Sequence, residues 1–579
     1  MAPALIVIAR KANDRSICER RRSGLSDKDS GDFMKNLRSW ALTAAAVALL
    51  AACGGNEPEI AGSGQPSGAP TTPGTFTAVV SFGDSLSDVG AYSPATSLTG
   101  NGQAPYFGGK FTANSATAKV WVENVATQLG VITTPAEVGF GTASVRCPAA
   151  ANPALAGTCT AYGQGGSRVT DPNGIGKAGG ALTVPMKTQI ANHLQRFSSF
   201  RASDLILVWG GNNDAFIQFG AFSVAAAQIQ TDAAAGRISA DEANLRLFQA
   251  QTAAQTEMKK AALELSGYVK TEILAKGGRY VAVFNLPDST LTPFGSTLPP
   301  TAKPVLSGLV DTFNLWLREG LTGVAVKIVD QNTPGKDVYL NPARYGIVNN
   351  TAPTCDAAAI SAITRGAVTD GSSLFCNSTA GAPFYGLRAG ANVNTWQFAD
   401  GVHPTGAGHR LVASVVTSTI AAPGQVSLAG ELPLQVYDDH SSAIAQSALD
   451  NKVGGTEVGS SRGFFKAQFG NQDYNATVNS PGLSTNSNTF TGGFEYRYSE
   501  GLSFGAAISL GGSNGDFNGG DIDGQEVLGS VFATGHFGNG YINGVLSVGS
   551  SSIDINREIV LGASTRVEEG NASASHKAM

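Results

Sequence analysis

Residues 76–88 read FTAVVSFGDSLSD, and this stretch decides the fold of the first part of the chain. The run from Phe76 to Phe82 is short, apolar and β-branched, which is typical of a strand buried in a sheet. A tight turn of small and polar residues follows it directly. The pattern therefore predicts a strand-to-helix turn that presents the Ser85 hydroxyl at the rim of a sheet.

Three further runs of the same kind occur at 204–209, 280–284 and 324–329. The stretches between and after them have helical patterns, around 118–129, 184–200, 225–275, 303–320 and 407–420. Such an alternation predicts an α/β sandwich, with a parallel sheet covered by helices on both faces. In that architecture functional residues lie at the carboxyl edge of the sheet, where strands end and loops begin.

A serine hydroxyl is a poor nucleophile unless a histidine, itself held by a carboxylate, takes its proton. Of the six histidines, His403 is the one with a carboxylate, Asp400, three residues upstream, close enough to orient its ring. His409 is expected on the following helix, in a structural role. Asp288 is the rival carboxylate, although its Leu-Pro-Asp loop fits a framework turn better. The sequence thus predicts Ser85 as nucleophile, His403 as base and Asp400 as orienting acid.

Acyl transfer by serine also needs hydrogen-bond donors aimed at the developing oxyanion. The loop 162–167, YGQGGS, can bring the N–H of Gly166 close to a substrate without side-chain hindrance. The segment after the second strand, GGNND, places the side-chain amide of Asn213 at the same rim. We interpret Asp88 and Asp214 as structural hydrogen-bond partners rather than catalytic acids.

Taken together, these segments resemble the four signature blocks of the GDSL (SGNH) serine esterases and lipases. In order, the blocks are Gly83-Asp84-Ser85-Leu86, the glycine pair ending at Gly166, Gly211-Asn212-Asn213-Asp214 and Asp400-Gly401-Val402-His403. The resemblance covers residues 76–423. One position departs from it, because the second block often begins with Asn where this chain has Ala161.

The resemblance implies a flavodoxin-like, three-layer SGNH hydrolase domain that acts on an ester or lipid substrate through an acyl-enzyme on Ser85. It implies the triad Ser85, Asp400 and His403, and oxyanion donors from the Ser85 N–H, the Gly166 N–H and Asn213. This mechanism requires no metal or organic cofactor. Transfer of the acyl group to an acceptor other than water stays open. So does a surface-display or adhesion protein whose esterase-like passenger is only a scaffold.

The N-terminal region reads as an export signal. Residues 34–52 combine a short basic start with an apolar run too brief to span a bilayer, which is a signal-peptide pattern. Cys53 ends a sequence that resembles the lipobox of bacterial lipoproteins, so we predict its lipidation; an ordinary signal peptide is the alternative. Residues 53–75 form a flexible tether. Residues 1–33 are interpreted as a misassigned translation start.

Four of the six cysteines fall as two close pairs, Cys147 with Cys159 and Cys355 with Cys376. In an exported chain, two local disulfides are the natural interpretation. Four unpaired thiols remain the alternative, and zinc is disfavoured because no histidine stands at ligand spacing.

After Pro423 the composition changes. Residues 424–455 are predicted to be a linker with a helix, and residues 456–579 contain Gly- and Asn-rich strands with alternating apolar positions, typical of a transmembrane β-barrel. This part resembles the translocator of autotransporter esterases, with a helix in the lumen and an outer-membrane location; a soluble all-β domain is the alternative. Only about six strands fit at usual strand lengths. We therefore predict an incomplete antiparallel β-barrel from a truncated sequence.

Composition excludes several other classes. The chain of 579 residues has 39 Lys and Arg against 44 Asp and Glu, so no basic surface for nucleic acid is expected. At 42% hydrophobic residues it can bury at least one large core. Its length argues for two or more domains.

Overall fold

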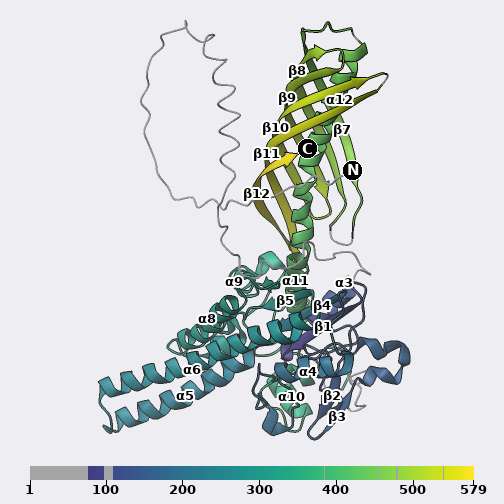
Figure 1. Cartoon of the computed structure of the whole chain (residues 1–579). Coiled ribbons are helices and arrows are strands. Elements are labelled where there is room, and N and C mark those ends of the chain that lie inside the picture. The colour runs from purple at the N-terminus through teal and green to yellow at the C-terminus, as the bar shows by residue number, and fades with distance from the viewer. Residues whose placement is uncertain (1–75, 97–107, 384, 454, 478–479, 539) are drawn as a thin grey trace.

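The computed structural model describes residues 76–579 apart from 97–107, 384, 454, 478–479 and 539. Within them the chain forms an α/β domain and a large antiparallel sheet, joined by a long helical segment (Figure 1). This arrangement confirms the predicted fold class. The expected signal peptide, the tether and Cys53 lie outside the described residues.

The α/β domain contains a parallel sheet with the strand order β1-β4-β5-β6. Its strands are β1 (Ala78–Gly83), β4 (Asp204–Trp209), β5 (Tyr280–Phe284) and β6 (Lys327–Val329). All residues of the first three strands are buried, which explains their continuous apolar runs. At the edge of β1, Ser81 pairs with Ala161 in a single parallel bridge. The loop after Ala161 therefore leaves the sheet at the same end as the turn after β1.

Helices cover both faces of this sheet. Trp121 of α3 contacts Trp209 of β4, with ring centroids 5.5 Å apart, whereas His193 of α4 contacts Phe82 of β1 at 5.9 Å. Because Phe82 is in register with Val208, the residue before Trp209, these contacts lie on opposite faces. The principal helices are α3 (Trp121–Gln128), α4 (Met186–Phe197), α8 (Lys303–Gly320) and α11 (Gly406–Ser427). Shorter elements are α2 (Ser93–Thr96), β2 (Glu137–Phe140), β3 (Ala143–Arg146), α7 (Pro293–Thr297), α9 (Asn332–Leu340) and α10 (Ala357–Ile363).

The expectation of one helical stretch over 225–275 was wrong. Two antiparallel helices, α5 (Asn212–Ala234) and α6 (Ala240–Tyr268), form a hairpin that projects from the α/β domain (Figure 1). The chain reverses at Gly236, whose φ of +69° suits glycine. Since α5 begins at Asn212, the third signature block forms the first turn of a helix.

The helix expected over 407–420 extends further than predicted. Pro423 lies inside α11, and a short turn, η10 (Leu428–Gly430), leads on to α12 (Leu432–Val453). Proline removes one N–H donor, but the helix continues because its apolar side remains packed. Ile420 on α11 and Leu432 on α12 are both buried. The rod formed by α11 and α12 therefore connects the α/β domain with the antiparallel sheet.

The antiparallel sheet is a six-stranded meander with the order β12-β11-β10-β9-β8-β7. Its strands are β7 (Ser461–Tyr474), β8 (Leu483–Ser499), β9 (Leu502–Phe517), β10 (Gly520–Phe537), β11 (Gly540–Leu561) and β12 (Ser564–Ala578). Among the described residues no pairing joins β7 to β12, so this sheet is not closed. The α12 helix packs against its inner face, where His440 contacts the hydroxyls of Ser509 and Ser530 at 2.6 and 2.5 Å.

Candidate active site

Three side chains that are far apart in the sequence form a continuous hydrogen-bonded chain. The Ser85 Oγ lies 2.8 Å from the His403 Nε2, and the His403 Nδ1 lies 2.8 Å from both carboxylate oxygens of Asp400. Ser85 begins a short 3-10 turn, η1 (Ser85–Ser87), directly after β1, while Asp400 and His403 lie in the loop before α11. This is the arrangement that nucleophile, base and orienting acid require.

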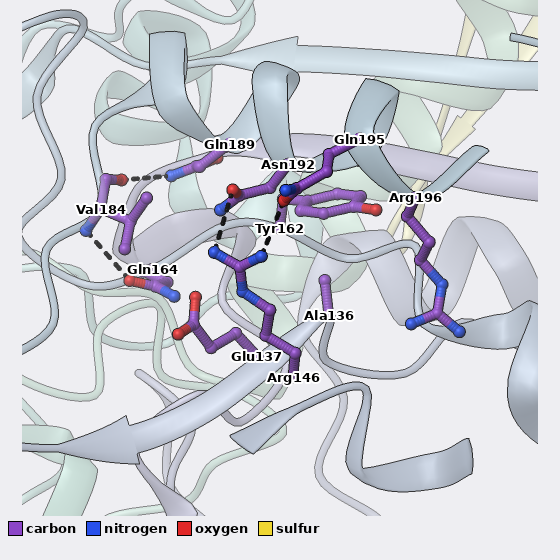
Figure 2. A pocket seen from close by; sticks show the side chains of 10 residues that line it. All are labelled: Ala136, Glu137, Arg146, Tyr162, Gln164, Val184, Gln189, Asn192, Gln195 and Arg196. Carbon is purple, nitrogen blue, oxygen red and sulfur yellow. Dashed lines mark hydrogen bonds between the residues drawn. The ribbon is translucent and has the colours of Figure 1, made fainter. Parts of the chain in front are cut away.

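The turn after β1 is fixed from the side of α4. The Gly83 N–H donates to Oε1 of Gln189 at 2.9 Å, and Nε2 of Gln189 donates to the Gly83 carbonyl at 2.8 Å. The same Nε2 donates to the Val184 carbonyl at 2.8 Å (Figure 2). A Cβ on Gly83 would lie 2.4 Å from the carbonyl oxygen of Trp209. Only glycine therefore allows the turn to lie so close to β4.

The loop that carries Asp400 is braced by its neighbours. Asp400 accepts hydrogen bonds from the N–H groups of Ser373 at 2.9 Å and of His403 at 2.8 Å. A disulfide joins Cys355 to Cys376, and the Cys355 N–H donates to the carbonyl of Ala399 at 2.9 Å. The second predicted pair, Cys147 and Cys159, is also joined by a disulfide, beside the β2–β3 hairpin.

The charges of His403 and Asp400 suit a base that is oriented by a carboxylate. Burial alone would lower the pKa of His403, but the Asp400 charge and hydrogen bond outweigh burial and hold that pKa above its ordinary value. Burial alone would raise the pKa of Asp400, but the His403 charge and the N–H donors around the carboxylate hold it well below its usual range. Asp400 is therefore ionised wherever His403 titrates.

Two of the three predicted oxyanion donors, Gly166 and Asn213, lie on segments beside the turn that carries Ser85, the third. Gly166 has a φ of +77°, and a Cβ there would lie 1.9 Å from the carbonyl oxygen of Ile175. Within the described part of the chain the Gly166 N–H donates no hydrogen bond. Asn213, in the first turn of α5, uses one amide hydrogen to donate to the carbonyl of Ser167 at 2.9 Å. Among the described residues, its second amide hydrogen has no acceptor, so it can donate to a further group.

The other candidates lie apart from this chain of groups. Asp288 accepts hydrogen bonds from the N–H and hydroxyl of Thr290, and it makes no contact with His403. His409 is fully buried: its Nδ1 accepts from the Trp121 N–H at 3.3 Å, and burial lowers its pKa to about 3. His409 therefore stays neutral and structural.

Several supporting residues carried no signal in the sequence. Gln189 and Ser373 lie in segments without a motif, and only the fold brings them to the site. Phe111 packs on the imidazole of His403, with ring centroids 4.7 Å apart. Asp84, by contrast, belongs to the first signature block; it accepts from the side-chain amide of Asn212 at 3.0 Å, and burial, partly offset by that bond, raises its pKa to about 6.

A cavity of about 190 Å³ lies beside the site but is distinct from it (Figure 2). Gln164 and Gln189 line it together with Tyr162, and Arg146 of β3 reaches across to Gln195 of α4 at 2.8 Å. None of Ser85, Asp400 and His403 lines it. The cavity therefore lies behind the turn after β1, on the side where Gln189 holds that turn, and not at the triad.

Comparisons with known proteins agree with this geometry. The family model of GDSL-like Lipase/Acylhydrolase matches residues 79–416, and that of the Autotransporter beta-domain matches residues 463–578. Two relatives called Esterase EstA, from Pseudomonas aeruginosa and Pseudomonas putida, are each 27% identical over 308 residues. A Pseudomonas putida protein described as an uncharacterized protein in the trpE-trpG intergenic region is 30% identical over 162 residues, 27% of this chain and 24% of that protein.

The match to each Esterase EstA covers 51% of this chain and 44% of the relative, so the chain spans less than half the length of those relatives. An autotransporter beta-domain implies the outer membrane or the cell surface. The GDSL family model covers more than half of the chain, including all four blocks. The protein belongs to the GDSL-like lipase/acylhydrolase family and carries an autotransporter beta-domain after its hydrolase domain.

Proposed function

We propose that this protein is an exported esterase or lipase that hydrolyses carboxylic ester bonds through an acyl-enzyme on Ser85. The observation that supports this most is the continuous chain from the Ser85 hydroxyl through His403 to Asp400, with 2.8 Å at each step. Family membership and the name of the EstA relatives point to the same reaction class.

The proposed mechanism follows from the positions of these groups. His403 takes the Ser85 proton at Nε2 while the serine oxygen attacks the ester carbonyl, and Asp400 stabilises the imidazolium that forms. The N–H groups of Ser85 and Gly166 and the amide of Asn213 stabilise the tetrahedral oxyanion. When this intermediate collapses, the alcohol leaves with the proton from His403. Water, deprotonated by the same imidazole, then releases the acid and restores Ser85.

We propose that the acyl part of the ester substrate is apolar. Phe216, on the first turns of α5, and Phe294 of α7 form an edge-to-face pair with ring centroids 5.7 Å apart, and both rings are partly exposed. The Phe294 N–H donates to the carbonyl of Gly401 at 2.8 Å, within the loop that carries Asp400 and His403. We propose that the acyl chain lies on this aromatic pair.

Display at the outer membrane is the proposed setting. The autotransporter beta-domain supports it, and a lipid anchor on Cys53, after a signal peptide at residues 34–52, would add a second attachment. We propose the same domain limits as the sequence predicts. The hydrolase domain spans residues 76–423 and the β-domain spans residues 456–579.

The test uses the purified full chain, a fluorophosphonate probe and nitrophenyl esters of two to twelve carbons. Labelling together with hydrolysis supports the proposal. Folded protein that neither binds the probe nor hydrolyses any ester contradicts it and favours a display or adhesion protein with a non-catalytic passenger. Labelling with acyl transfer to an added alcohol, but without release of free acid, would identify an acyltransferase instead.

A further inference from the structure

We infer that Asp88 and Asp214 are positioning residues that hold the two ends of the oxyanion loop, which we define as Gly165–Val169. The inference rests on the proposed function, because it assigns these carboxylates to the hole that stabilises the tetrahedral intermediate. Neither carboxylate touches the triad in the structure; each acts through backbone N–H groups of this loop.

Asp88 ties the first end of the loop to the nucleophile turn. Its Oδ2 accepts from the Gly165 N–H at 3.0 Å, and its Oδ1 accepts from the N–H groups of Gly90 and Ala91 at 2.9 and 2.7 Å. The Asp88 side chain is completely buried. The residue follows η1, the 3-10 turn that Ser85 begins, as its C-cap. One carboxylate therefore links the turn that carries the nucleophile to the peptide directly before Gly166.

Asp214 ties the second end to α5. Its Oδ2 accepts from the Val169 N–H at 3.0 Å, and its Oδ1 accepts from Nε of Arg168 at 2.9 Å. It is 3% exposed and directly follows Asn213, the other oxyanion donor. The three residues between the two anchored N–H groups include Gly166, so its free N–H is aimed from both sides.

Two carboxylates, rather than neutral groups, suit this task. Burial raises the pKa of Asp88 to about 7, although its three N–H donors oppose that rise, so the carboxylate is ionised above that pH, where its hydrogen bonds are about twice as strong as neutral ones. A carboxylate also offers two oxygens, and Asp88 uses both, for three N–H donors. An asparagine would keep one acceptor and turn its NH₂ group toward an N–H of the loop. Asp88→Asn should therefore loosen the Gly165 end of the loop while nearly preserving the side-chain volume.

The test compares three full-length variants on one short-chain nitrophenyl ester. Asp88→Asn and Asp214→Asn should each lower kcat at least about tenfold with KM within about twofold, because the oxyanion forms only in the transition state, where losing one donor costs about 10²–10³. The matched control is Asp204→Asn. Asp204 is 1% exposed and accepts from Arg201, but it begins β4, at the end of the strand remote from the site.

Unfolding midpoints are measured alongside the rates. A kcat loss in Asp88→Asn or Asp214→Asn that exceeds the loss in Asp204→Asn at a comparable unfolding midpoint supports the inference. Equal kcat values in all four proteins overturn it, as do kcat losses in the three variants that simply follow their midpoints. If Asp88→Asn does not fold, Asp214→Asn decides alone. If the wild-type chain shows neither hydrolysis nor labelling, the proposed function itself is contradicted. That outcome differs from failure of the inference, in which the wild-type chain is active.

Discussion

The two sheets of this protein differ in how much of their apolar surface is exposed. In the parallel sheet, β1, β4 and β5 are buried along their whole length, and most of their side chains are apolar. In the antiparallel sheet, Thr491, Ser509 and Ser530 face α12 and are buried, while Phe469 and Val531 are 74% and 59% exposed. The first pattern excludes water from a core. The second is the pattern of a wall that faces lipid.

This difference separates the two tasks of the chain. A buried parallel sheet provides a rigid edge on which loops from distant segments converge, as Ser85 and His403 do. The outward apolar face of the antiparallel sheet is the proposed site of membrane attachment. The chemistry should therefore respond to changes at the first sheet, and membrane attachment to changes at the second.

The largest effect is expected from removing the nucleophile. Ser85→Ala should lower kcat/KM for a short-chain ester by at least about 10³-fold, because no other hydroxyl of the described residues is paired with His403. The full chain should keep its unfolding midpoint and its membrane association. Initial rates with nitrophenyl acetate provide the measurement. Substantial residual hydrolysis by this variant would place the reaction outside the edge of the parallel sheet.

The outward face of the second sheet gives the next effect. Val531→Arg introduces a charge on β10, which costs about 2–4 kcal/mol at a bilayer midplane. The amount of full chain recovered in phosphatidylcholine vesicles should fall at least about tenfold. Val224→Arg is the control, because Val224 is 74% exposed on α5, in the α/β domain. Equal recovery of both variants would contradict the assignment of the apolar wall to lipid.

The pH profile sharpens the description of the first sheet. His403 must be neutral to accept the Ser85 proton, and its pKa is held above the ordinary value by Asp400. Activity should therefore fall as the pH drops through that raised pKa, by at least about tenfold between pH 8 and 5. In Asp400→Asn the acidic limb should move to lower pH. An unchanged limb in this variant would mean that another group titrates.

The smallest effect concerns substrate choice. Phe294→Ala should raise KM for an eight-carbon ester about threefold to tenfold more than for acetate, as expected for loss of one apolar contact surface. Phe248→Ala, an exposed aromatic on α6, serves as control and should change neither value. The ratio of the two KM values is the readout. A uniform change across chain lengths would remove Phe294 from the acyl site.

Much of the fold could be predicted because buried parallel strands are short apolar runs with turn residues at their ends. The α5–α6 hairpin was missed because alanine-rich helical sequence continues on both sides of the reversal at Gly236. The continuation of the helix through Pro423 was missed because proline usually ends a helix. Here the packing of α11 and α12 outweighs that local preference.

In the candidate site, too, some residues could be predicted from local sequence and others could not. Ser85, Asp400 and His403 stand in short sequence motifs, and the four blocks taken together pointed to them as candidates. Gln189 and Ser373 reach the site only through backbone contacts made after folding. For Asp88 the sequence suggested a structural partner, but not which N–H groups it would hold.

Mapping the fluorophosphonate adduct by peptide mass spectrometry, in the wild-type chain and in His403→Ala, tests the convergence of the two distant loops most directly. The convergence predicts an adduct on the peptide containing Ser85, formed at least about 10³-fold more slowly in the variant. An adduct on another residue, or equal rates in both proteins, would contradict it.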